Sequence, residues 1–102
     1  MPTANINGIT MYYRRRDAGS GPPLLLIPGF GGHAGAFAPQ YAAFSAPYDV
    51  IAIDNRGAGR TSAPDEPYSM AGMADDCIAL LDQLGVERAH VLGTSMGGMI
   101  AQ

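Results

Sequence analysis

Lysine and tryptophan are absent from these 102 residues, and only one cysteine is present. A single cysteine cannot form an internal disulfide, and no cluster of Cys and His has the spacing of a zinc site. Six arginines stand against nine acidic residues, and a net charge of −3 does not fit the basic surface of a nucleic-acid-binding protein. The sequence also lacks both the apolar run of about 18 residues that a membrane span requires and an N-terminal signal peptide. We therefore expect a soluble, cytoplasmic protein that has no metal or cofactor and acts on a small molecule.

Apolar runs and turn residues predict an α/β protein that begins with a hairpin. Residues 4–6 and 9–13 flank Asn7-Gly8, and an Asn-Gly pair favours a tight hairpin because both of its residues tolerate positive φ. Residues 17–23 are rich in Gly and Pro and are a predicted loop. The short apolar run at residues 24–27, bounded by proline, indicates a strand that is buried on both faces. Residues 49–53 and 89–92 are the second and third predicted buried strands.

Helices are predicted between these strands. Residues 36–44 form the first, with Pro39 near its first turn, where the missing N–H has no helical partner to lose. Ser69 can cap the second helix, and Gly85 can end it. Its apolar stripe consists of Met70, Met73, Cys77, Leu81 and Leu84, and Asp75, Asp76 and Asp82 lie off that stripe. Strands that alternate with helices imply a mostly parallel sheet with helices on its faces.

The residues Gly93-Thr94-Ser95-Met96-Gly97 match the pattern G-x-S-x-G and follow a predicted strand. In that setting the serine lies on a tight, strained turn into a helix, and the two glycines remove the Cβ atoms that would collide there. The serine hydroxyl is then exposed at the carboxyl edge of the sheet, beside the free N–H groups of the next helix. Those groups would stabilise the negative oxygen that develops on an acyl substrate. The alternative is a glycine-rich turn with an idle serine.

Two further segments favour the functional interpretation. Pro28-Gly29-Phe30-Gly31-Gly32 follows a predicted strand, and its flexible backbone can direct one N–H group at the same oxygen. Residues 54–62 follow the next strand and read Asp-Asn-Arg-Gly-Ala-Gly-Arg-Thr-Ser. In this order and spacing, the three segments resemble the N-terminal half of an α/β-hydrolase-fold enzyme. They are most similar to the group of esterases, 3-oxoadipate enol-lactonases and cofactor-free haloperoxidases, and the resemblance covers essentially the whole chain.

The resemblance implies roles for individual residues. Ser95 would be the catalytic nucleophile, and the backbone N–H groups of Met96 and Phe30 would form the oxyanion hole. The family's loop after the next strand is matched by Asp54, Arg56, Gly57 and Gly59. The aspartate and arginine of that loop would support it structurally rather than react. Pro28 is a departure, because many members carry His there; that His is not part of the catalytic triad, so the departure concerns the subfamily.

The two histidines and the cysteine have simpler interpretations. His33 lies beside the proposed oxyanion loop, and we expect it at the surface or in a supporting role. His90 begins a predicted strand, and we expect a structural residue there. Cys77 lies on the apolar stripe of its helix, which favours a buried packing thiol over a nucleophile.

Two alternative functions remain open at this point. Residues 29–34 also read G-x-G-x-x-A after a strand, with Asp54 about twenty residues on, which is the fingerprint of a Rossmann-type dinucleotide binder. That fingerprint needs a helix running straight on from the glycines, and Pro39 in its interior would cost about 3 kcal/mol. It also leaves the hairpin and the Ser95 turn without a role. In the other alternative, an α/β-hydrolase fold binds a small molecule without turning it over.

A serine nucleophile needs a base and an acid that orients the base, and in this fold their order is Ser, then Asp or Glu, then His. His33 and His90 precede Ser95, and nothing follows Gln102. We therefore expect residues 1–102 to be the N-terminal portion of one α/β-hydrolase domain. Its C-terminal half would be a partner, in the same protein or as a separate chain. The complete protein would hydrolyse an ester or lactone of a small molecule through an acyl-serine intermediate.

The 102-residue chain alone should be inactive, because it contains neither the expected acid nor the expected histidine. Incubation of the purified chain with a p-nitrophenyl ester should release p-nitrophenol no faster than buffer does. Turnover that is lost in the Ser95→Ala variant would refute this expectation.

Overall fold

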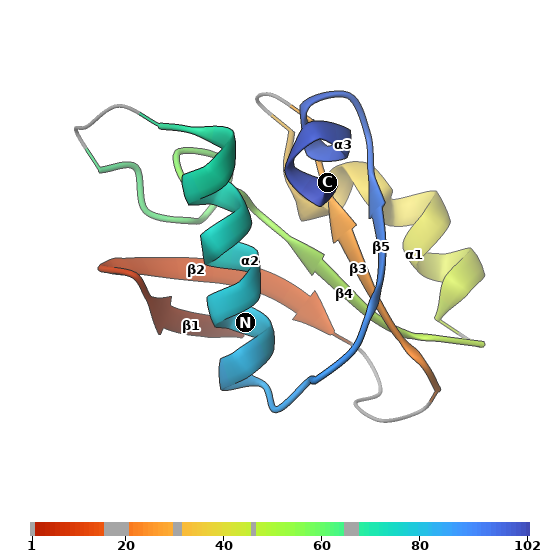
Figure 1. Cartoon of the computed structure of the whole chain (residues 1–102). Coiled ribbons are helices and arrows are strands. Elements are labelled where there is room, and N and C mark those ends of the chain that lie inside the picture. The colour runs from red at the N-terminus through yellow and green to blue at the C-terminus, as the bar shows by residue number, and fades with distance from the viewer. Residues whose placement is uncertain (1, 16–20, 30–31, 46, 65–67) are drawn as a thin grey trace.

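A five-stranded sheet runs through the molecule, with helices packed on its two faces (Figure 1). The computed structural model describes residues 2–15, 21–29, 32–45, 47–64 and 68–102. Two of the sequence predictions therefore fall in part outside the described residues: the loop at 17–20 and the glycine-rich segment at Phe30 and Gly31. The strands are β1 (Thr3–Ile6), β2 (Ile9–Arg15), β3 (Pro23–Ile27), β4 (Asp49–Ile53) and β5 (His90–Gly93). The helices are the 3-10 helix η1 (Ala34–Phe37), α1 (Ala38–Phe44), α2 (Met70–Gln83) and α3 (Met96–Ala101).

The sheet has the strand order β1-β2-β4-β3-β5. β1 pairs with β2 and β2 with β4 in antiparallel fashion, whereas β3 is parallel to both β4 and β5. This arrangement confirms the predicted hairpin followed by parallel strands. Because β3, β4 and β5 run in the same direction, the loops that follow them leave from one edge of the sheet.

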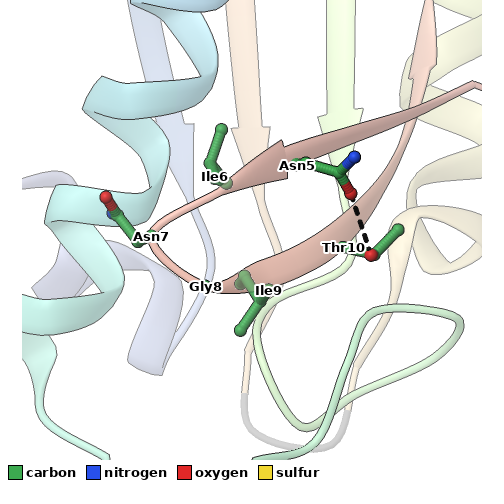
Figure 2. A pocket seen from close by; sticks show the side chains of 6 residues that line it. All are labelled: Asn5, Ile6, Asn7, Gly8, Ile9 and Thr10. Carbon is green, nitrogen blue, oxygen red and sulfur yellow. Dashed lines mark hydrogen bonds between the residues drawn. The ribbon is translucent and has the colours of Figure 1, made fainter.

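The hairpin turn has the predicted geometry. Asn7 and Gly8 have φ values of 46° and 77°, and Ile6 pairs with Ile9 across a two-residue loop. Figure 2 shows the Thr10 hydroxyl donating to the side-chain oxygen of Asn5 at 3.0 Å, and Asn7 extending toward α2. The shallow hollow of about 340 Å³ at this tip has no ionisable side chain among its lining residues, so it offers no catalytic group.

The parallel strands β3 and β4 bury residues on both sides of the sheet, as predicted. Leu25 and Ile27 of β3 face a core that includes Leu80 of α2 and Ile100 of α3. Leu24 and Leu26 face a second core, which contains Phe37 of η1. Alternation along the strands therefore supplies both helix layers with an apolar surface.

The helix predicted over 36–44 begins differently in the structure. Residues Ala34–Phe37 form η1, and α1 starts only at Ala38, so Pro39 occupies the first turn. That position suits proline, because its ring supplies the required φ and its missing N–H has no helical partner to lose. His33 caps η1, its Nδ1 accepting a hydrogen bond from the Gly35 N–H at 3.1 Å.

Helix α2 follows its predicted limits. The Ser69 hydroxyl accepts a hydrogen bond from the Gly72 N–H at 2.9 Å, and Gly85 follows the helix with a φ of 73°. Cys77 is buried as predicted, and desolvation, helped by the charge of Asp76, raises the pKa of its thiol to about 12. None of the helices in the described part of the chain is long and apolar enough to cross a membrane.

Two expectations about burial were wrong. The strand predicted at 89–92 was expected to be buried, but Val91 of β5 is 44% exposed. Asp76 was placed off the apolar stripe of α2, yet it is only 1% exposed.

Asp76 is buried because three segments converge on its carboxylate. The Arg56 guanidinium donates to it through two nitrogens, at 2.7 and 2.9 Å, and the Asn7 amide donates at 3.1 Å. A bidentate pair with an additional hydrogen bond offsets the cost of removing the carboxylate from water. Asp76 thus joins the hairpin tip, the loop after β4 and helix α2.

Removing this carboxylate should be far more destabilising than removing its neighbour. We expect Asp76→Ala to lower the free energy of unfolding by about 3–5 kcal/mol, because it removes one partner of a buried bidentate ion pair. The matched control is Asp75→Ala, whose exposed side chain should contribute no more than about 0.5 kcal/mol. Urea denaturation of both variants measures the difference, and equal losses would contradict this account of the ion pair.

Candidate active site

Three loops meet at the edge of the sheet where β3, β4 and β5 end. The first follows β3 and begins at Pro28-Gly29, the second follows β4 and covers residues 54–62, and the third is the turn at Thr94 and Ser95 between β5 and α3. The sequence placed its candidate residues on these same three segments. The Thr94 N–H donates to the Ile27 carbonyl at 3.2 Å, which ties the third loop to the end of β3.

Ser95 occupies the strained turn that the motif predicts. Its φ of 53° and ψ of −118° lie where L-residues rarely stand, and a conformation of this kind costs about 1–3 kcal/mol. The side chain is exposed, and among the described residues none forms a hydrogen bond with its hydroxyl. Hydrogen bonds from the Gly97 N–H to the Thr94 carbonyl (2.8 Å) and from the Gly98 N–H to the Ser95 carbonyl (2.9 Å) close the turn.

The two glycines of the motif are required by close backbone contacts. A Cβ on Gly93 would collide with the carbonyl group of Gly97. A Cβ on Gly97 would collide with the carbonyl oxygen of Ile27 and lie 2.8 Å from that of Pro28. Contacts this short cannot be relieved by moving a flexible side chain, because both sides are backbone. The turn therefore depends on glycine at both positions.

Gly29 brings the loop after β3 against the serine. A Cβ built on Gly29 would lie 3.3 Å from the Cβ of Ser95 and 4.0 Å from the backbone nitrogen of Met96. Met96 is the first residue of α3, so its N–H has no acceptor within the helix. This N–H is one of the two predicted oxyanion-hole donors. The other, the N–H of Phe30, lies outside the described residues.

The loop after β4 has a structural role at the site, and the carboxylate of its Asp54 is buried rather than exposed to a substrate. The Asp54 carboxylate is buried and accepts hydrogen bonds from the N–H groups of Ala34 (2.5 Å) and Arg60 (2.8 Å). Gly59, with a φ of 53°, leaves room for this carboxylate, since a Cβ there would collide with it. The contacts of Asp54, and those of Arg56 with Asp76, agree with the structural role that the resemblance implied.

Asn55 is a buried polar residue that the sequence interpretation passed over. It is 2% exposed, and its side-chain amide donates to the Pro28 carbonyl at 3.2 Å. The only signal in the sequence is an amide side chain two residues after a buried strand, which does not identify a partner 27 residues earlier.

Neither histidine stands as a base for Ser95. His33 is exposed, and its Nδ1 is engaged by the Gly35 N–H. His90 begins β5, at the strand end opposite the serine, and its ring packs edge to face on Tyr48 at 5.9 Å. Within the described ranges, no group of three or more His, Cys, Asp or Glu side chains gathers as metal ligands would.

A small hollow of about 100 Å³ adjoins the turn at Ser95. It lies between Gly29 and Met96 on one side and the loop after β4 on the other, and Tyr68 and Met73 complete its wall. The Tyr68 hydroxyl donates to the Pro64 carbonyl at 2.9 Å, which orients the ring over Gly57. The hollow is mainly apolar and lies next to the predicted oxyanion donor.

A sheet of this topology with a serine on a strained strand-to-helix turn defines the class of proteins built around a nucleophile elbow. The family model described as "alpha/beta hydrolase fold" matches residues 22–102, and the chain belongs to that family. This membership confirms the resemblance noted in the sequence. The helices also argue against the dinucleotide-binding alternative, because η1 and α1 replace the single helix that the fingerprint needs.

Individual relatives cover almost all of this chain. It is 42% identical over 100 residues to "Putative carbamate hydrolase RutD" of Azorhizobium caulinodans, covering 98% of this chain and 37% of that protein. The enol-lactonase of Burkholderia xenovorans LB400 superposes with a TM-score of 0.92 at 36% identity, covering 97% of this chain and 39% of the other. Est816, described as an N-acyl homoserine lactone degrading enzyme, gives a TM-score of 0.91 at 38% identity, covering 98% and 38%. The chain thus spans less than two fifths of the length of these proteins.

Substitution by alanine should have different effects on stability at two adjacent glycines of α3. We expect Gly97→Ala to lower the free energy of unfolding by about 3 kcal/mol or more, because the new methyl group meets the backbone of β3. At Gly98 a Cβ would make only ordinary contacts, the nearest at 3.5 Å. Gly98→Ala should therefore be neutral or stabilise by up to about 1 kcal/mol through helix propensity. Chemical denaturation of the pair tests this, and a harmless Gly97→Ala would refute the proposed close contact.

Proposed function

We propose that the protein containing this chain is a serine hydrolase that cleaves an ester or lactone of a small molecule through an acyl-serine intermediate. The observation that carries the proposal is the position of Ser95, exposed on a strained turn beside Gly29 and the N–H of Met96. A protein gains nothing in stability from a non-glycine residue in this backbone conformation. A serine in this conformation, at the edge where three loops meet, supports a chemical role for the hydroxyl.

The proposed reaction has two steps. The Ser95 Oγ attacks the substrate carbonyl carbon while a base takes its proton, and the carbonyl oxygen becomes an oxyanion beside the Met96 N–H. Collapse of this intermediate breaks the bond to the alcohol oxygen, which leaves with the proton from the base. Water then attacks the acyl-serine in the same way, releasing the carboxylic acid and restoring the serine. A lactone follows the same steps, except that the leaving alcohol stays attached to the acyl group.

The base and its orienting acid are proposed to come from residues that follow Gln102 in the longer protein. The support is the order Ser, acid, His along the chain in this fold, together with the engagement of His33 and His90 elsewhere. We propose a cytoplasmic enzyme that needs neither metal nor cofactor, with the C-terminal half of the domain as partner of this chain.

The substrate class rests on the acyl chemistry of the site and on the named relatives. Two of them are described as an enol-lactonase and an N-acyl homoserine lactone degrading enzyme, which favours esters and lactones. The second candidate is a carbamate, because a carbamate hydrolase name accompanies a relative that is 42% identical. A carbamate carbonyl accepts the same attack, so a panel of esters, lactones and carbamates separates the candidates by kcat/KM.

A fluorophosphonate probe should label Ser95 in the full-length protein, because it forms a stable adduct with an activated serine. Peptide mass spectrometry should locate the adduct at Ser95, and Ser95→Ala should abolish labelling. The matched control is Ser45→Ala, because the Ser45 hydroxyl donates to the Tyr41 carbonyl before β4 begins, at the end of the sheet opposite Ser95; this variant should leave labelling unchanged. An unlabelled Ser95 in folded full-length protein would overturn the proposal.

A further inference from the structure

Two consecutive residues at the end of β4 hold the two ends of the loop that follows β3. The Asn55 amide donates to the Pro28 carbonyl at 3.2 Å, and the Asp54 carboxylate accepts from the Ala34 N–H at 2.5 Å. Both side chains are 2% exposed, so these hydrogen bonds are shielded from competing water. Pro28, where the loop starts, is therefore held by Asn55, and Ala34, where it finishes, is held by Asp54.

The amide at position 55 is matched to its partner. The Pro28 carbonyl is an acceptor in a buried setting and needs a donor, which Asn can supply and Asp cannot. Position 54 has the opposite requirement, because its partners are backbone N–H groups. The Asp54 carboxylate thus accepts from the Ala34 N–H, and the next residue, Asn55, donates to the Pro28 carbonyl.

The carbonyl held by Asn55 also contacts the nucleophile elbow. The Pro28 oxygen would lie 2.8 Å from a Cβ on Gly97, so it packs against the first turn of α3. The next residue, Gly29, faces Ser95 and Met96, and its carbonyl accepts from the Gly32 N–H at 3.0 Å. The sequence-predicted oxyanion donor, the N–H of Phe30, belongs to the residue after Gly29. A rotation of the Pro28 peptide group would change how Gly29 meets Ser95 and Met96.

We propose that Asn55 is a positioning residue for the oxyanion loop: its amide fixes the orientation of the Pro28 carbonyl and thereby the approach of Gly29 to Ser95. This inference rests on the proposed acyl-serine function. Asn55 borders the hollow beside Ser95 but is only 2% exposed, so its effect on acylation runs mainly through the backbone that it holds. Its loss should reduce kcat far more than it changes KM, because the side chain offers almost no surface to a bound substrate.

The experiment uses the full-length protein with Asn55→Leu, which removes the donor at similar volume, and Asn55→Asp, which replaces it with an acceptor. We expect each to lower kcat for a p-nitrophenyl ester, and the rate of fluorophosphonate labelling of Ser95, by about 10- to 100-fold. KM should change by less than about twofold. Because Asn55→Asp places two acceptors opposite each other, its loss should equal or exceed that of Asn55→Leu.

The matched control is Thr61→Val. The Thr61 hydroxyl is buried, accepts from the Tyr12 N–H at 2.9 Å and donates to the Asp54 carbonyl at 2.7 Å, without contacting the loop after β3. Its loss should shift the unfolding midpoint as much as the loss of the Asn55 amide does, yet leave the labelling rate within about twofold of the wild type. If Asn55→Leu fails to fold, Asn55→Ser, which is too short to reach Pro28, provides the same comparison.

The outcomes separate the two proposals. Folded Asn55 variants that label at the wild-type rate, or that lose rate only in step with Thr61→Val, would overturn the positioning role and leave the acyl-serine function intact. Absence of labelling in the wild type would overturn the proposed function and this inference with it. A selective loss of kcat at position 55 supports both.

Discussion

The architecture of the site depends on one close backbone approach, in which helix α3 passes the end of β3 with no side chain between them. Gly97 lies so near the carbonyl oxygen of Ile27 that a single methyl group would separate the two elements. This approach determines the direction in which the chain leaves β5 and so holds Ser95 at positive φ. The same strand end continues into Gly29, which packs against the serine. Sterics at the backbone level therefore determine where the hydroxyl lies.

A second set of contacts gives these loops a rigid base. The Asp76 carboxylate binds Arg56 and Asn7, so helix α2, the loop after β4 and the hairpin tip share one buried anchor. The loop anchored in this way then contacts the loop after β3 through Asn55 and Asp54. Contacts thus extend without interruption from the hairpin to the nucleophile elbow, although most of the residues involved are far apart in sequence.

Features with a local cause could be predicted from the sequence. The Asn7-Gly8 turn and the strained conformation of Ser95 each depend on residues that are adjacent in the sequence. Both predictions were confirmed by the positive φ values at these positions. The burial of Asp76 was missed because its main partner, Arg56, lies 20 residues away, where helical periodicity carries no information. Asn55 was missed for the same reason, since a carbonyl 27 residues away determines its role. The exposure of β5 depends on which strands pair with it, and apolar composition alone does not contain that information.

The backbone conformation of Ser95 also constrains how the sequence can change over time. Glycine adopts a φ of 53° with a ψ of −118° more readily than any other residue. The substitution that best relieves the strain of this turn is therefore Ser95→Gly, which removes the hydroxyl. Stability and the proposed nucleophilic role of Ser95 therefore impose opposite requirements on this one position. Any lineage that retains the serine carries a permanent local strain, and improvements in stability must accumulate elsewhere in the fold.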